Sequence, residues 1–143
     1  MATKTDKTAA AQPRRLMIRG DRLLLALDVL AGWVHPHPSV DLLFSQRKID
    51  SVISQYIPKR FSDNPRVDEP DYRECFQKWY VATIEPVHRF LSANEDDIAT
   101  TMFAASELIT MLQERVAHHA AHAFERFICA IASGELTEAD FKE

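Results

Sequence analysis

Acidic and histidine side chains recur on one predicted helical face near the C-terminal end of the chain. Glu114, His118 and His122 are spaced i, i+4 and i+8, so on a continuous helix they project from the same side. Carboxylate and imidazole groups in this spacing are typical zinc ligands. The apolar stripe of the same helix, around Val116, points the opposite way. A metal site in a helical bundle takes inward ligands from several helices, so the pattern favours a solvated histidine face over a metal site.

A lone histidine, His88, offers a different kind of chemistry. The run from Tyr80 to His88 places Ile84 and Val87 before the histidine and resembles the proximal-helix segment of globin-type haem sensors. That resemblance implies a haem iron ligated by His88, but it covers a short part of the chain and supports no family assignment. A histidine bonded to Glu85 or to a carbonyl group is the favoured interpretation, and no cofactor is expected.

Catalysis finds no support in the motifs. The chain has no nucleophile elbow, no P-loop and no cysteine–histidine signature. The acidic runs at 68–71 and 95–97 lie where helices are expected to begin, and helix starts favour negative charge. The sequence therefore predicts a protein that is not an enzyme.

The net charge of −4 conceals an uneven distribution. Residues 1–60 carry ten Lys or Arg against five Asp, whereas residues 61–143 carry seven Lys or Arg against sixteen acidic residues. Attraction between the halves, within the fold or an oligomer, is the favoured explanation. The alternative is a strip that contacts phosphates as part of a nucleoprotein complex. Its candidate residues are Arg14, Arg15, Arg19, Arg22, Arg47, Lys48, Lys59 and Arg60.

These side chains must be positioned by helices, because no run of alternating β-branched residues marks a strand. The longest predicted helix spans about 95–133, from an N-cap at Asn94 to a C-terminal stop at Gly134. Its length would be roughly 58 Å at the standard rise. Shorter helices are predicted at 21–34, from Ser39 to Pro58, and from Pro70 to Leu91 with a kink at Pro86. The expected fold is all-α, a compact bundle of four to five helices organised around the long C-terminal helix.

The predicted organisation is a disordered basic arm at residues 1–15 and a single helical domain at 16–143. Two cysteines, Cys75 and Cys129, are too few for a disulfide framework and are expected to act as small hydrophobic residues. No apolar run is long enough to cross a membrane. A cytoplasmic protein is therefore expected.

Surplus apolar surface gives the leading hypothesis for function. Phe103, Met111 and Ile128 fall outside the apolar stripe of the long helix, and such residues tend to mark interfaces. The favoured function is a non-catalytic helical protein–protein interaction module, which binds another protein or a second copy of itself. The alternatives are the nucleic-acid-associated subunit and a haem- or metal-binding sensor. A bundle that buries more than one side of the long helix would remove the apolar argument.

Overall fold

The computed structural model describes residues 16–35, 44–64 and 66–143. Apart from one two-stranded ribbon, the regular elements are helical, which confirms the all-α class. In chain order they are β1 (Met17–Arg19), α2 (Gly20–Val34), α3 (Gln46–Tyr56), α4 (Tyr72–Trp79), the π-helix η2 (Tyr80–Ile84), α5 (Glu85–Ala93), α6 (Glu95–Ile98), β2 (Met102–Ala104), α7 (Ser106–Gln113), α8 (His118–Ser133) and the 3-10 turn η3 (Glu138–Phe141).

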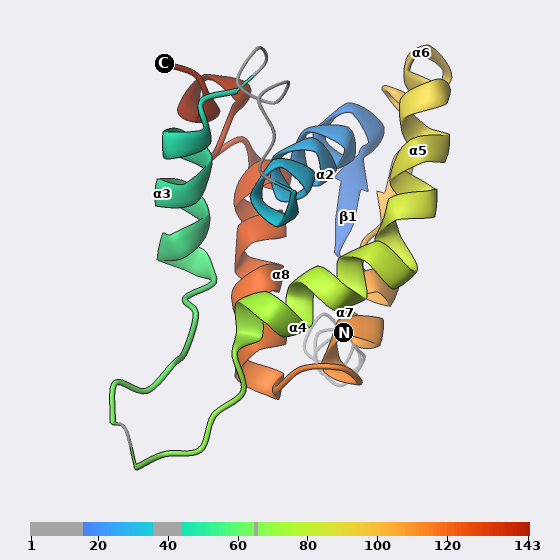
Figure 1. Cartoon of the computed structure of the whole chain (residues 1–143). Helices are drawn as coiled ribbons and strands as arrows, with labels where there is room; N and C mark the ends of the chain where they lie inside the picture. Colours follow the sequence, from blue (N-terminus) through green and yellow to red (C-terminus); the bar gives the residue numbers. More distant parts are fainter. Residues whose placement is uncertain (1–15, 36–43, 65) are drawn as a thin grey trace, which may run out of the picture.

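The centre of the molecule is α2. Figure 1 shows it between α8 and α3 on one side and α5 on the other. Apolar residues on several of its faces are buried, from Leu23 to Val34, as expected for a helix covered on more than one side. Trp33 at its end packs against Phe76 of α4, and Phe76 and Trp79 pack against Phe124 of α8. These aromatic contacts join three segments that are far apart in the sequence.

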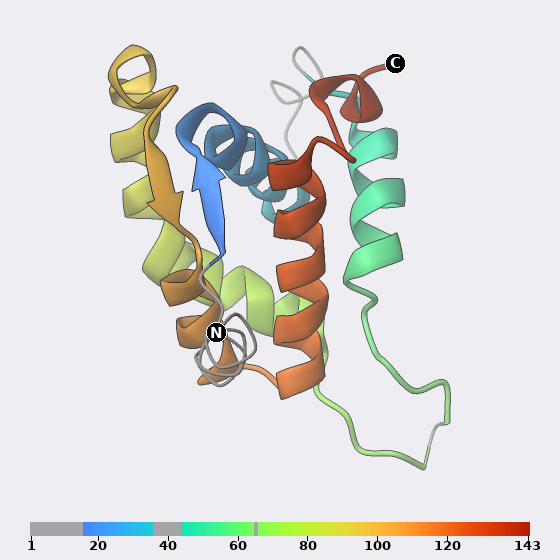
Figure 2. The ribbon, with the colours of Figure 1, turned by 180° about the vertical axis from the view of Figure 1, so that it is seen from behind.

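The predicted long helix at 95–133 is wrong, because the chain breaks it twice. It becomes α6, β2, α7 and α8, with one break at residues 99–105 and another at residues 114–117. In the first break β2 pairs antiparallel with β1, with Ile18 opposite Phe103. Figure 2 shows this ribbon between α8 and the α5–α6 edge. The backbone groups that a helix would have used internally are satisfied by a strand distant in sequence.

The break at residues 99–101 also caps α2. The N-cap position, Arg19, makes no side-chain capping bond. Instead the backbone N–H groups of Gly20 and Asp21 donate to the carbonyl oxygens of Thr101 and Ala99, at 2.7 and 2.9 Å. Two of the N–H groups that a helix start leaves unpaired are thereby satisfied from another segment.

The predicted third helix is continuous but irregular. It runs through α4, η2 and α5, and Pro86 lies in the first turn of α5, where its missing N–H costs little. Asp71 caps α4 by accepting from the N–H of Glu74. The irregularity expected at Pro86 is thus present as a π-helical stretch directly before it, a feature that is frequent at functional sites.

Several local predictions can be compared directly. Thr137 and Asp140 form a capping box at η3, and Gly134 ends α8 with φ of 85°. The second helix is capped by Ser45, and the predicted cap at Ser39 lies outside the described residues. The predicted arm at residues 1–15 lies outside them too. Cys75 is partly buried, whereas Cys129 is exposed, which contradicts the expectation that it acts as a small hydrophobic residue. Among the described helices, none is long and apolar enough to cross a membrane.

Candidate functional site

Tyr80, His88 and Asp28 form a chain of hydrogen bonds between three helices. The Tyr80 hydroxyl lies 2.7 Å from Nδ1 of His88, and Nε2 of His88 lies 2.6 Å from a carboxylate oxygen of Asp28. Tyr80 belongs to η2, His88 to α5 and Asp28 to α2. Tyr80 is 1% exposed, and the side chain of His88 is 14% exposed. The hydrogen-bond chain therefore ties the outer helix α5 to the central helix α2 through two groups with little access to water, Tyr80 and His88, and through the carboxylate of Asp28, whose side chain is 41% exposed.

The hydrogen bonds of this cluster can be satisfied with His88 neutral or protonated. With neutral His88 the phenol donates to Nδ1, and Nε2–H donates to Asp28. With protonated His88 both ring nitrogens donate, and the phenol can turn toward the carbonyl oxygen of Leu27, at 3.4 Å. Burial, followed by the charges of Asp28 and Glu85, raises the pKa of the Tyr80 phenol, so it remains a donor at neutral pH. Because both His88 nitrogens are engaged, neither presents a lone pair to a haem iron in this arrangement.

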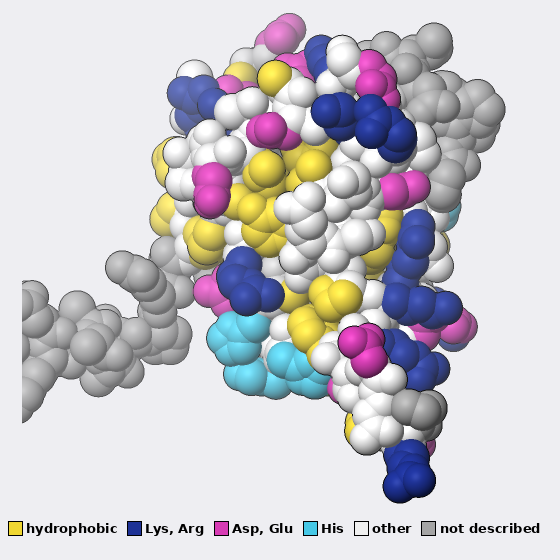
Figure 3. All heavy atoms as spheres, turned by 90° about the vertical axis from the view of Figure 1, so that its left-hand side faces the viewer, with side chains coloured by type: hydrophobic (Ala, Val, Ile, Leu, Met, Phe, Trp, Pro, Cys, Tyr) yellow, Lys and Arg dark blue, Asp and Glu magenta, His cyan; other side chains and the backbone are white. Residues whose placement is uncertain are grey.

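Histidines gather at the start of α8. His118, His119 and His122 are exposed, and Figure 3 shows a cluster of histidine side chains on one face of the molecule. Nε2 of His118 lies 2.9 Å from Nε2 of His122, and Nδ1 of His122 lies 3.6 Å from Glu125. The predicted third ligand, Glu114, lies in the break before α8 and is not on the same helix. Within the described residues, no group of three or more His, Cys, Asp or Glu side chains could hold a metal.

His119 differs from its two neighbours because it makes contacts with other elements. Its Nε2 lies 2.6 Å from the hydroxyl of Tyr72, and its ring packs edge-on against Phe61 at 4.4 Å. Burial, followed by the charges of Glu69 and Cys75, raises the pKa of Tyr72. His119 therefore fixes the first turn of α8 against the start of α4 and the loop before it.

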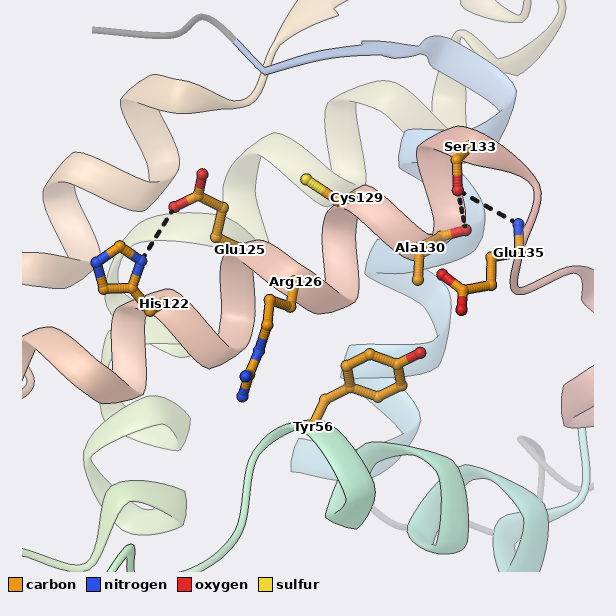
Figure 4. Close-up of a pocket in the computed structure, with 8 residues that line it drawn as sticks. All are labelled: Tyr56, His122, Glu125, Arg126, Cys129, Ala130, Ser133 and Glu135. Atoms are coloured by element: carbon orange, nitrogen blue, oxygen red, sulfur yellow. Dashed lines mark hydrogen bonds and ion pairs between the residues drawn. The ribbon is translucent and has the colours of Figure 1, made fainter.

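A groove of about 500 Å³ runs between α3 and α8. Figure 4 shows that Tyr56 enters it from α3, and that His122, Arg126 and Cys129 come from α8. Burial, followed by the charges of Glu135 and Asp140, raises the pKa of Tyr56. The sequence analysis missed this groove, because it depends on how α3 docks against α8. Its charges of both signs select no single ligand class.

The three predicted interaction residues occupy different environments. Ile128 is 1% exposed and belongs to the core, so its assignment to surplus surface is wrong. Phe103 is partly buried against the core from β2. Met111 on α7 is 36% exposed and is the one of the three that presents apolar surface. The predicted helix face does not exist as one surface, because the three residues lie on separate elements.

Three large apolar side chains on η2 and α5 are exposed. Val81, Val87 and Phe90 are 47%, 42% and 64% exposed, and we call them the α5 edge. The inward positions of this segment are Ile84 and Leu91, with the partly buried His88 between them, whereas the residues of the α5 edge are exposed.

Three of the eight residues of the predicted basic strip form ion pairs. Arg19 pairs with Asp21, Arg47 with Glu143 and Lys59 with Asp71. The last two pairs join the basic first half of the chain to the acidic second half. Contact with phosphates requires exposed cations. Arg60 is exposed, whereas Arg22 is partly buried. Lys48 is partly buried, and Arg14 and Arg15 lie outside the described residues.

Comparison with known proteins adds no relative. No family model, no curated protein and no solved structure matches the chain.

Proposed function

We propose that this protein is a non-catalytic helical module that binds another protein through the α5 edge. The observation that carries the proposal is the exposure of Phe90, at 64% the most exposed large hydrophobic side chain among the described residues. Apolar surface left in water is unfavourable, by about 25 cal/mol for each Å². Aromatic residues are more frequent in protein–protein interfaces than on the rest of the protein surface.

Neighbouring charges favour a partner of a particular kind. The turn after α5 carries Glu95, Asp96 and Asp97, all exposed. Within α5 the one Lys or Arg is Arg89, and its guanidinium lies 3.1 Å from the carboxylate of Glu85. The α5 edge is therefore apolar with an acidic end. An amphipathic partner segment with Lys or Arg beside its apolar residues would match both features.

The polar chain supports this proposal indirectly. Because Tyr80, His88 and Asp28 bond to one another, they hold α5 against α2 and keep its outer face in place. A binding surface carried by a fixed helix loses less conformational entropy when a partner docks.

The test is crosslinking from defined surface positions in the source cells. A photoreactive amino acid at position 90 should give a discrete protein adduct, and adding Val87→Glu should abolish it. The matched control is position 67, where Val67 is 40% exposed in the loop before α4. No adduct from position 90, or equal adducts from both positions, would refute the proposal. Circular dichroism should show unchanged helicity, because exposed substitutions cost about 0.5 kcal/mol or less.

A further inference from the structure

We propose that His118 and His122 form a chelating site for one divalent transition-metal ion, with Glu125 orienting the second imidazole. This inference does not depend on the α5 edge. It rests on side chains within one helix, α8.

The separation of the two rings matches what one ion requires. Metal–nitrogen bonds of imidazole are about 2.0–2.1 Å. Two nitrogens bound to one ion at 90–110° are therefore about 2.8–3.4 Å apart. The observed Nε2–Nε2 distance is 2.9 Å, with the ring planes at 87°. Without a metal, one ring donates its Nε2 proton to the other. If the donor ring moves that proton to its own Nδ1, both Nε2 atoms have a lone pair available for the ion, with no net loss of a proton.

Glu125 lies beside the ring of His122, on the side away from the proposed ion. Its carboxylate lies 3.6 Å from Nδ1 of His122, the nitrogen that carries the proton when Nε2 binds a metal (Figure 4). At this separation the two groups form an ion-pair contact; a carboxylate that accepts a hydrogen bond from this N–H fixes the ring orientation of a metal-bound histidine and raises its basicity, and Glu125 is within reach to do so. The side chain of His122 is 56% exposed, so the remaining coordination positions are open to water or to a ligand from another molecule.

The backbone of the site is already held in position. Ala121 and Phe124 are buried in the core, and His119 is bonded to Tyr72. The first turn is nevertheless weakly capped, because Ala117 provides no side-chain acceptor. A chelate between residues i and i+4 fixes that turn, so metal binding should stabilise the helix start.

The chemistry of the ligands defines the ions expected to bind. Imidazole nitrogen suits zinc, nickel and copper, with affinity rising from nickel to copper, whereas magnesium and calcium prefer oxygen ligands. Coordination needs neutral imidazole, so affinity should fall as the pH is lowered.

The experiment is calorimetric titration of the full chain, without a purification tag, with Ni²⁺, Zn²⁺ and Mg²⁺. We expect one Ni²⁺ or Zn²⁺ per chain and no Mg²⁺ binding. His118→Ala and His122→Ala should each weaken binding at least about tenfold, and Glu125→Gln about tenfold, as loss of an orienting carboxylate does. The matched control is His35→Ala, a histidine at the end of α2 that lies outside α8 and should leave metal affinity unchanged.

Either of two titration results would overturn the proposal: no saturable Ni²⁺ or Zn²⁺ binding by the wild type, or unchanged affinity in His118→Ala and His122→Ala. Imidazole resonances of the unmodified protein provide a test that does not depend on variant folding. Addition of Zn²⁺ should shift the signals of His118 and His122. A shift confined to His119 or to other histidines would also overturn the proposal.

Discussion

Replacing Tyr80 with phenylalanine isolates the contribution of the polar chain. The change removes one hydroxyl and keeps the buried ring, so the packing of η2 should be preserved. It leaves Nδ1 of His88 without the phenol at 2.7 Å, on a side chain that is only 14% exposed. A buried polar group that loses its partner costs about 1–3 kcal/mol of stability. The contact with the carbonyl oxygen of Leu27, at 3.4 Å, is long and should add little.

The matched control is Tyr56→Phe. Tyr56 packs against Phe127 with ring centroids 5.7 Å apart, but it opens onto the groove between α3 and α8. Removal of its hydroxyl should change the free energy of unfolding by about 0.5 kcal/mol or less, as is usual for a site near solvent. The difference between the variants therefore reports the hydrogen-bond chain.

Urea unfolding at pH 7, followed by circular dichroism, measures both effects. The Tyr80→Phe variant should have a lower midpoint with an unchanged slope, which indicates a loss of stability and not a change in the unfolded state. Combining Tyr80→Phe with Asp28→Asn should give a non-additive loss, because both residues bond to His88. Equal losses in the two tyrosine variants, or additive losses in the double variant, would refute the role assigned to the chain.

Other predictions follow from burial and backbone contacts. The free energy of unfolding should fall as the pH rises above 10, the ordinary phenol pKa. The raised pKa of Tyr80 makes the folded state retain a proton that the unfolded chain releases. Urea midpoints from pH 9 to 11 should therefore fall less steeply in Tyr80→Phe than in the wild type. Gly20→Ala should prevent or severely impair folding, because the new methyl group would overlap the carbonyl group of Ile98. Gly134→Ala meets no neighbour and should cost only about 1 kcal/mol of stability for its positive φ. Thermal unfolding of the two variants measures this difference. Ile128→Asp should unfold the protein by burying a charge, and Met111→Asp should leave its circular dichroism spectrum unchanged; similar spectra for the two would contradict their assigned burial.

The sequence was sufficient where local chemistry decides the structure. The helix at 20–34, the capping box at Thr137 and the left-handed Gly134 all follow from side-chain types and spacing. The histidine pair was also identified, because His118 and His122 remain on one helix. Glu114 was lost as its third member because the spacing argument assumed a helix without a break.

The long helix failed for a reason that involves distant segments. A domain of this length has a radius of gyration of about 14–15 Å, so a rod of roughly 58 Å would extend well beyond it. Compactness requires a break, but helix propensity alone does not locate it. The break occurs at residues 99–104, which make two sets of backbone hydrogen bonds with the start of the domain. They pair with β1 through Met102–Ala104, and their carbonyl groups cap α2 at Gly20 and Asp21.

Those two contacts explain why Gly20 stands between the strand and the central helix. The backbone of Ile98 approaches so closely that a Cβ at position 20 would lie 1.8 Å from its carbonyl oxygen. The cap on α2, the β1–β2 ribbon and the end of the α5–α6 segment therefore depend on one close approach. The segment that carries the α5 edge is attached to α2 at one end by this approach and in its middle by the bond from His88 to Asp28. If Tyr80→Phe loosened α5, crosslinking from position 90 should weaken although Phe90 itself is unchanged. A loss of stability with undiminished crosslinking would show instead that the Gly20 contact alone holds the binding surface.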